Sequence, residues 1–192
     1  MSYYEENADN YKELWNDEFK KNYSFNIPET FLKYLEQNSY ILDLGCGTGR
    51  DSLYFKEMGF KVECVDASKK MCKIASSLLN QKVHEINFLN IDYDNLFDGV
   101  YACASLLHLN NDDLLLCLKK INKALKQNGI FYSSFKLGTE TRISNNRYFN
   151  DMTEEKFQNI CNQIREFHII KHWITNKYQS NEKFINFLIK KK

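Results

Sequence analysis

The sequence predicts an α/β fold with a doubly wound sheet of seven strands, mostly parallel, that ends in an antiparallel C-terminal strand pair. Short apolar segments alternate with amphipathic segments of about 10–15 residues, which is typical of βαβ units. Several apolar segments are continuous rather than alternating, as expected for strands buried on both faces of a sheet. In such a fold the ligand binds at the carboxyl ends of the strands.

The first half of the chain begins this alternation with a helix over Pro28–Gln37, where proline fits the first turn. Arg50–Met58 has helical spacing, and Ser68 caps a helix that runs through Leu79. The predicted strands of this half are Tyr40–Leu44, Lys61–Asp66, Val83–Phe88 and Gly99–Ser105.

The second half continues with an amphipathic helix over Asp112–Lys126 that ends at Asn128-Gly129, a common stop signal. Ile130–Phe135 is a strand, and Thr153 starts a further helix. The antiparallel pair is predicted at His168–Thr175 and Lys183–Ile189, around a turn at Gln179–Asn181.

Composition limits the class of protein. A chain of 192 residues and 22.8 kDa has the size of one domain. With 26 basic and 25 acidic residues, and only four arginines, it lacks the charge excess of a nucleic-acid binder. Its N-terminus does not resemble a secretory signal, and no segment approaches the roughly 20 apolar residues that span a bilayer. The six scattered cysteines contain no C-x-x-C pair, so we expect a cytoplasmic protein with reduced thiols and no membrane partner.

A glycine-rich turn is the most informative segment. Glycines at positions 45, 47 and 49 follow a buried strand and precede a helix, so the backbone can approach a ligand closely. Arg50 replaces the last glycine of the dinucleotide fingerprint, and the P-loop pattern is absent, so a phosphate ligand is disfavoured. Asp66 ends the next strand, at the distance where an acid binds a ribose diol. These residues favour a nucleoside ligand without phosphate, such as S-adenosylmethionine.

The segment Asp43–Gly49 together with Asp66 resembles motifs I and II of class I S-adenosylmethionine-dependent methyltransferases. Phe97–His108 resembles their motif IV, and Lys123–Gly129 is similar to their helix-to-strand step, with Gln127 and Asn128 in place of the usual proline and glycine. Tyr4–Tyr11 resembles the lid segment of small methyltransferases of the tellurite-resistance and quinone-biosynthesis type. The resemblance implies a Rossmann-like fold and an enzyme that transfers a methyl group from S-adenosylmethionine.

The resemblance also implies a cofactor site. Its expected contacts are Tyr11, Asp43, Gly45, Cys46, Gly47, Gly49, Arg50, Asp66, Ala67, Asn87, Phe88 and Cys103. Asn87 stands where the family often has an acid that receives the adenine amino group. The single domain then divides into a helical lid segment (1–37), the cofactor-binding core (38–137), a substrate-side loop (138–152) and a C-terminal helix with the strand pair (153–192).

His108 follows the fourth strand, and its near-neutral pKa suits proton abstraction from an acceptor. The alternatives are that it caps the next helix or packs on the adenine. His168 and His172 are expected to be a structural pair on one face of a strand rather than metal ligands, and no metal site is predicted.

The polar loop after the fifth strand opens over the same edge of the sheet. Arg147 is a candidate anchor for an anionic acceptor, with Tyr148 and Phe149 stacking on it; the alternative is an ordinary surface loop. Tyr3, Tyr4 and Tyr11 either form the opposite wall of the pocket or anchor a helix.

Absent motifs narrow the acceptor. With Pro28 the only proline, the chain has neither a D/N-P-P-Y motif nor a Pro-Cys nucleophile. The leading hypothesis is methylation of a small molecule at O, N or S by a monomer or homodimer. The alternatives are a tRNA or protein methyltransferase, a protein that binds S-adenosylmethionine without transferring the methyl group and, least favoured, a nicotinamide dehydrogenase.

Overall fold

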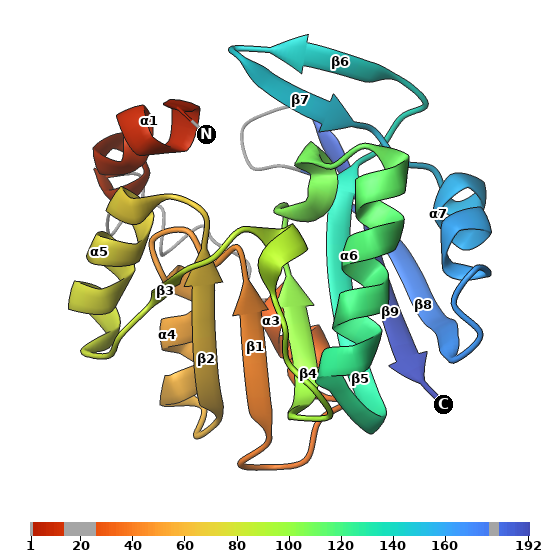
Figure 1. Cartoon of the computed structure of the whole chain (residues 1–192), viewed down its shortest axis with the longest axis horizontal. Coiled ribbons are helices and arrows are strands. Elements are labelled where there is room, and N and C mark those ends of the chain that lie inside the picture. The colour runs from red at the N-terminus through yellow and green to blue at the C-terminus, as the bar shows by residue number, and fades with distance from the viewer. Residues whose placement is uncertain (1, 14–25, 177–180) are drawn as a thin grey trace.

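The computed structural model describes residues 2–13, 26–176 and 181–192, and these contain a seven-stranded sheet. The strands lie in the order β3-β2-β1-β4-β5-β9-β8 (Figure 1). Their bounds are Tyr40–Leu44 (β1), Lys61–Asp66 (β2), His84–Glu85 (β3), Phe97–Ala102 (β4), Leu125–Lys136 (β5), Phe167–Asn176 (β8) and Lys183–Lys191 (β9). The pairs among β1 to β5 are parallel, and β9 is antiparallel to both β5 and β8. The predicted fold class is therefore confirmed.

Helices cover both faces of this sheet (Figure 1). On one face lie α3 (Asn26–Leu32), α4 (Arg50–Glu57) and α5 (Lys69–Leu79), where the buried rings of Phe31 and Phe55 meet Tyr101 of β4. On the other face lie α6 (Asn111–Ala124) and α7 (Glu154–Cys161). There Phe157 stacks on Phe187 of β9, with ring centroids 4.1 Å apart. The two apolar cores hold the strand ends in fixed positions, which is what a site at those ends requires.

Two helix starts follow from local capping. The Ser68 hydroxyl accepts a hydrogen bond from the Met71 amide (3.2 Å) and begins α5, as predicted. The Thr153 hydroxyl accepts one from the Lys156 amide (3.2 Å) and begins α7. Both helices therefore begin where the sequence indicates.

Three predicted elements have different ends in the structure. The helix expected over Pro28–Gln37 is α3, which ends at Leu32 and continues only as turns. The strand expected over Val83–Phe88 is reduced to the two residues of β3, because the Asn87 side chain accepts from the Leu89 amide and starts a short 3-10 helix, η1 (Phe88–Asn90). The strand expected over Gly99–Ser105 is β4, which ends at Ala102.

Asn128-Gly129 does not end the helix before it, contrary to the prediction. α6 already ends at Ala124, and these two residues lie inside β5, where the pairing register with β4 shifts. Asn128 has φ 64°, and a Cβ on Gly129 would lie 2.9 Å from the Lys126 oxygen. The pair therefore forms a bend within a strand, which requires the same conformational freedom as a helix stop.

The segment predicted as a loop over residues 138–152 contains a β-hairpin. Its strands are β6 (Thr141–Ser144) and β7 (Arg147–Asn150), joined by Asn145 and Asn146 with φ of 50° and 56°. A two-residue turn with positive φ at both positions matches the twist of a hairpin, and asparagine tolerates that conformation. The hairpin stands above the carboxyl ends of β4 and β5 (Figure 1).

A β-bulge in β8 corrects the interpretation of the two histidines. His168 pairs with Lys190 and Lys171 with Leu188, so Ile170 is an extra residue. His172 consequently lies on the same face as Phe187, whereas His168 lies on the opposite face. His172 is 3.2 Å from a Glu154 carboxylate oxygen, a structural contact. The predicted turn at Gln179–Asn181 lies mostly outside the described residues.

Candidate functional site

The candidate site lies where the order of the strands reverses, between the carboxyl ends of β1 and β4. After β1, the Gly45 and Cys46 amides both donate to the Val65 carbonyl, at 2.9 and 3.0 Å. After β4, the Ser105 hydroxyl donates to the Leu44 carbonyl at 2.8 Å. These bonds tie the glycine turn (residues 45–49) to its neighbours on both sides.

The three glycines of this turn serve two different purposes. All have positive φ, of 82° at Gly45, 56° at Gly47 and 86° at Gly49. A Cβ on Gly45 would lie 2.6 Å from that of Ser105, and one on Gly49 would lie 3.1 Å from that of Ala75. A Cβ on Gly47 would meet nothing within 4 Å. Gly45 and Gly49 are therefore needed for packing, and Gly47 alone faces open space.

Asp66 is held rigidly at the end of β2. One carboxylate oxygen accepts from the Gly47 amide at 2.9 Å and the other from the Ser68 amide at 2.8 Å. Burial raises the pKa of Asp66, and the hydrogen bonds from the Ser68 and Gly47 amides oppose that shift. Ala67 follows directly in the bend to α5. The carboxylate is thus oriented toward the glycine turn before any ligand arrives.

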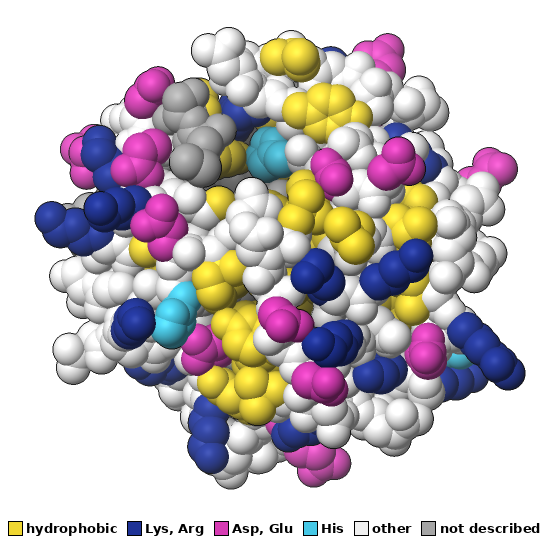
Figure 2. Space-filling model, in the orientation of Figure 1, with side chains coloured by type: hydrophobic (Ala, Val, Ile, Leu, Met, Phe, Trp, Pro, Cys, Tyr) yellow, Lys and Arg dark blue, Asp and Glu magenta, His cyan; other side chains and the backbone are white. Residues whose placement is uncertain are grey.

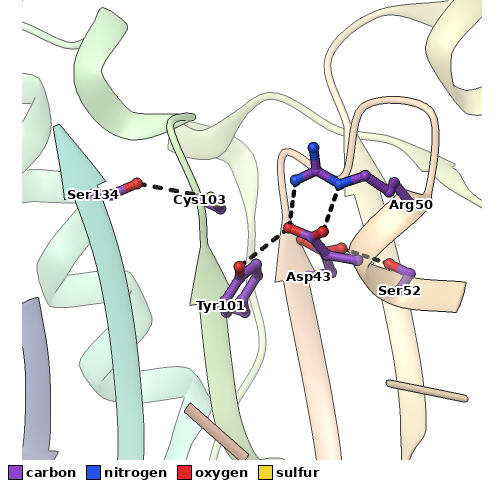
Figure 3. A network of polar contacts seen from close by, with 7 residues as sticks. Asp43, Arg50, Ser52, Tyr101, Cys103 and Ser134 are labelled. Carbon is purple, nitrogen blue, oxygen red and sulfur yellow. Dashed lines mark hydrogen bonds and ion pairs between the residues drawn. The ribbon is translucent and has the colours of Figure 1, made fainter. Parts of the chain in front are cut away.

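Asp43 is the second carboxylate of the site and is only 3% exposed. It accepts a hydrogen bond from the Ser52 hydroxyl of α4 at 2.5 Å (Figure 3). Burial raises its pKa to about 7, which outweighs the Ser52 hydrogen bond, and the nearby Asp51 carboxylate adds to the increase. At neutral pH Asp43 is therefore a mixture of protonated and charged forms, unlike an ordinary aspartate.

Arg50 is bound to Asp51 in this structure. Its Nε and one terminal nitrogen lie 2.6 and 2.9 Å from the two oxygens of Asp51, and the Tyr101 hydroxyl donates to the same carboxylate at 3.1 Å (Figure 3). Within this network the guanidinium is turned to a carboxylate of α4. The expected contact of Arg50 with the methionine end of the cofactor stays a prediction.

The remaining predicted cofactor residues surround the same turn with different exposure. The Phe88 ring lies beside Gly45, 3.1 Å from where its Cβ would be, whereas Asn87 is exposed at the start of η1. Cys103 lies after β4, within 3.8 Å of the Ser134 hydroxyl (Figure 3). Burial raises the pKa of the Cys103 thiol, and a contact with Cys64 does the same for Cys46. Both cysteines stay protonated at neutral pH and are not nucleophiles.

The N-terminal helix α1 (Ser2–Glu13) contacts both sides of the site through two adjacent residues. On one side, a Glu5 carboxylate oxygen accepts from the Ser68 hydroxyl at 2.6 Å and the Lys70 amide at 3.1 Å. On the other, the Tyr4 hydroxyl lies 2.7 Å from Nε2 of His108, at the end of the 3-10 helix η2 (Leu106–His108). Figure 1 shows α1 and the β6–β7 hairpin side by side above the sheet.

The hydrogen bonds of His108 determine its tautomer. Its Nδ1 lies 2.7 Å from the Tyr148 carbonyl oxygen, which can only accept, so Nδ1 carries the proton. Nε2 then has a lone pair and accepts from the Tyr4 hydroxyl. Burial lowers the pKa of His108, which keeps the ring neutral, and raises that of Tyr4 to about 12. His108 does not cap α6, because the Asn110 side chain does so.

Arg147 lies in an aromatic cluster formed by Tyr3, Tyr4 and Phe149. Its guanidinium carbon is 3.8, 5.6 and 5.0 Å from the three ring centroids. Tyr11, a predicted cofactor residue, is next to this cluster, 5.7 Å from the Tyr4 ring. The Tyr148 side chain lies on the face of β7 opposite to Arg147 and Phe149, because successive side chains of a strand point to opposite faces. The expected stacking of Tyr148 on the acceptor stays a prediction. Only the Tyr148 carbonyl oxygen reaches His108.

Ala104 and Ser105 are part of the site but were not among the predicted contacts. Ala104 has φ 49°, a conformation that a residue with a Cβ rarely adopts, and its amide donates to the Ser134 hydroxyl at 2.8 Å. The sequence signal for both residues is their place in the segment that resembles motif IV, where they were predicted to continue the strand. The surface pocket between α6 and α7, by contrast, contains none of the predicted site residues.

The residues present fit a nucleoside that carries an amino acid. Asp66 faces the turn and Asp43 lies just before it, and carboxylates can accept from ribose hydroxyls and an ammonium group but would repel phosphates. Gly47 leaves space against the backbone, and Phe88 offers an apolar surface. In the described parts of the chain, no group of three or more His, Cys, Asp or Glu side chains is arranged to hold a metal, and no helix is long and apolar enough to cross a membrane.

Comparison with known proteins gives the same result. Residues 41–129 match the family described as "Methyltransferase domain". Mouse glycine N-methyltransferase is 36% identical over 110 residues, which cover 47% of this chain and 38% of that one. The fold is that of 1,6-didemethyltoxoflavin-N1-methyltransferase from Burkholderia thailandensis, with a TM-score of 0.79, 20% identity and coverage of 97% and 84%. A TehB-like S-adenosylmethionine-dependent methyltransferase from Corynebacterium glutamicum gives a TM-score of 0.76, 17% identity and coverage of 97% and 99%.

The chain spans about half the length of the curated relatives it matches. The matched residues nevertheless include the glycine turn, Asp66 and the turn after β4. The resemblance seen in the sequence, the strand order and these matches agree: residues 41–129 form a methyltransferase domain, and the chain has the fold of S-adenosylmethionine-dependent methyltransferases.

Proposed function

We propose that this protein transfers the methyl group of S-adenosylmethionine to an oxygen, nitrogen or sulfur atom of a small-molecule acceptor in the cytoplasm, as a monomer or homodimer. The observation that carries the proposal is α1, which bridges Ser68 on one side of the site and His108 on the other. Together, α1 and the hairpin flank the carboxyl ends of the strands (Figure 1). A site flanked by two such segments suits an acceptor small enough to lie between them.

The cofactor would be held by the predicted residues of the core. Asp66 would accept from the ribose hydroxyls, and Phe88 would pack against the adenine. The methionine part would lie along the glycine turn, with Asp43 facing its ammonium group. When bound, S-adenosylmethionine supplies a methyl group already activated by the positive sulfur, so the protein mainly aligns the acceptor. These roles fit the open space at Gly47 and the orientation of Asp66.

His108 would receive the proton that an acceptor loses, and Tyr4 would lie between His108 and the acceptor. Nε2 already accepts from the Tyr4 hydroxyl, so a proton can reach it only through that hydroxyl. The acceptor's proton would pass to the Tyr4 oxygen as the Tyr4 proton passes to Nε2. An acceptor that attacks through a neutral lone pair would need this relay only after transfer.

A tRNA or protein substrate has less support. Such an enzyme would be expected to have a basic stripe near the mouth of its site. The face shown in Figure 2 carries basic and acidic side chains side by side, without an unbroken basic stripe. The chain as a whole has a net charge of +1.

The first test is calorimetric titration with S-adenosylhomocysteine of the wild type, Asp66→Ala and Glu85→Ala. Glu85 is an exposed acid on the neighbouring strand, paired in register with Asp66, and is the matched control. We expect micromolar binding by the wild type and the control. Asp66→Ala removes the two hydrogen bonds from the ribose hydroxyls to a charged group, so the affinity of this variant should fall at least about 100-fold. No binding by the wild type, or unchanged binding by Asp66→Ala, would contradict the cofactor site.

The second test is transfer of a labelled methyl group to a panel of small amines, phenols, carboxylic acids and thiols, with tRNA and protein extract in parallel. We expect turnover with a member of the small-molecule panel. Turnover only with RNA or protein would contradict a small acceptor. Binding of the cofactor without any turnover would favour a protein that uses it as a signal.

A further inference from the structure

Arg147 has no acidic partner among the described residues, unlike Lys136 and Arg142. Lys136 is paired with Glu182, and Arg142 is paired with Asp151, so the charges of these two side chains are already compensated. Arg147 makes no ion pair with any described residue, and its one hydrogen bond is a long one, 3.4 Å to the Tyr4 hydroxyl. Its Nε is buried and has no hydrogen-bond partner within the part of the chain that the structure describes.

The surroundings keep Arg147 charged without supplying a counter-ion. Burial removes part of the hydration of its guanidinium, while the Tyr4 hydroxyl and the neighbouring rings favour the charged form. The rings of Tyr3, Tyr4 and Phe149 contact the guanidinium through carbon and leave Nε without an acceptor. A guanidinium held in this way is prepared for a planar anion that can accept two parallel hydrogen bonds.

The position of Arg147 relates this charge to the proposed acceptor. Phe149 packs against His108 with ring centroids 4.9 Å apart, and Tyr4 bridges Arg147 and His108 by hydrogen bonds. Arg147 therefore lies beside the group that would take the acceptor's proton. The cofactor would bind at the glycine turn and Asp66. These lie at the ends of β1 and β2, whereas Arg147 lies on β7.

We propose that Arg147 binds the carboxylate of an aromatic or otherwise planar methyl acceptor, which makes this protein selective for small anionic substrates. The proposal rests on the methyltransferase function proposed above. Tyr3 and Tyr4 would line the space for the acceptor's ring, so that charge and shape are recognised together. Because α1 carries both tyrosines and the hairpin carries Arg147, the acceptor site is complete only when these two segments meet.

The test measures binding of a carboxylate probe without requiring turnover. Binding of 4-fluorobenzoate and of its neutral analogue 4-fluorobenzamide is followed by fluorine NMR, on protein saturated with S-adenosylhomocysteine. We expect the benzoate to bind the wild type at least about tenfold more tightly than the amide, and Arg147→Gln to remove that preference. Arg147→Lys, which keeps the charge but loses the fork, should retain part of it. Arg165→Gln, on an exposed turn, is the matched control and should behave as the wild type.

The same samples separate this proposal from the cofactor assignment. Equal binding of benzoate and benzamide by the wild type would overturn it, as would an unchanged preference in a folded Arg147→Gln. The methionine carboxylate of the cofactor is the other possible anion, so S-adenosylhomocysteine is compared with 5′-methylthioadenosine, which lacks it. If Arg147→Gln weakens only S-adenosylhomocysteine, Arg147 binds the cofactor and the proposal is wrong. If the wild type binds neither nucleoside, the proposed function itself fails.

Discussion

The burial of Asp43 predicts that cofactor binding depends on pH. Its pKa of about 7 means that half of the free protein carries a neutral Asp43 at pH 7, whereas an ordinary aspartate would be fully charged. An ammonium group bound beside it favours the charged form and lowers this pKa, so binding releases a proton. Affinity is therefore highest above pH 7 and is lost as the pH falls through that value.

The size of the effect follows from the same pKa. The ligand binds the charged form of Asp43, and about nine-tenths of Asp43 is protonated at pH 6 but only about one-tenth at pH 8. The affinity for the cofactor should therefore rise roughly tenfold from pH 6 to pH 8. Calorimetric titration with S-adenosylhomocysteine at pH 6, 7 and 8 measures this rise. Repeating the pH 7 titration in buffers with different ionisation enthalpies should show about half a proton released per ligand bound.

Asp43→Asn should remove the pH dependence, whereas Asp92→Asn, at an exposed acid, should keep it. Equal affinity of the wild type at pH 6 and pH 8 would refute the reasoning. A slope that persists in Asp43→Asn would assign the proton to another group of the site. The first candidate would then be Asp66, whose pKa is also raised by burial.

Two further predictions concern stability. Gly47→Ala must hold a positive φ, so its free energy of unfolding in urea should fall by about 1–2 kcal/mol. Gly45→Ala adds a clash with Ser105, so the fall should be about 2–5 kcal/mol. Equal losses in the two variants would show that Gly45 is not needed for packing. Ser68→Ala removes the cap of α5 and the hydrogen bond to Glu5, so the free energy of unfolding should fall by about 1–2 kcal/mol and amide exchange in α1 should accelerate. Unchanged exchange in α1 would mean that the Ser68–Glu5 contact does not hold this helix in place.

The parts of the fold that were predictable have local causes. Tyr40–Leu44 is a short apolar segment and Lys61–Asp66 alternates as a strand does, and both strands have the predicted ends. Ser68 and Thr153 cap the helices that follow them. The hairpin over Thr141–Asn150 was not predicted because Asn145-Asn146 is a weaker turn signal than Asn-Gly, and polar strands have no hydrophobic alternation.

The site was predictable where a motif lies in one segment. The glycine turn and Asp66 are close in sequence, and the structure joins them through the Gly47 amide. The contact between Tyr4 and His108 joins positions 104 residues apart, which no local pattern specifies. The bulge at Ile170 is of the same kind, because an extra residue in a strand is determined by the partner strand and not by its own sequence.

The same bulge affects how the sheet ends. In the part of the chain that the structure describes, β3 and β8 are the outermost strands, and unpaired outer strands can recruit a strand from another molecule and start aggregation. β3 has only two residues, too few to template an intermolecular pair. β8 is long, but Ile170 breaks its regular spacing of amides and carbonyls, and Lys171 places a charge beside the break. The sheet is thus protected from edge-to-edge growth by shortness at one border and irregularity at the other.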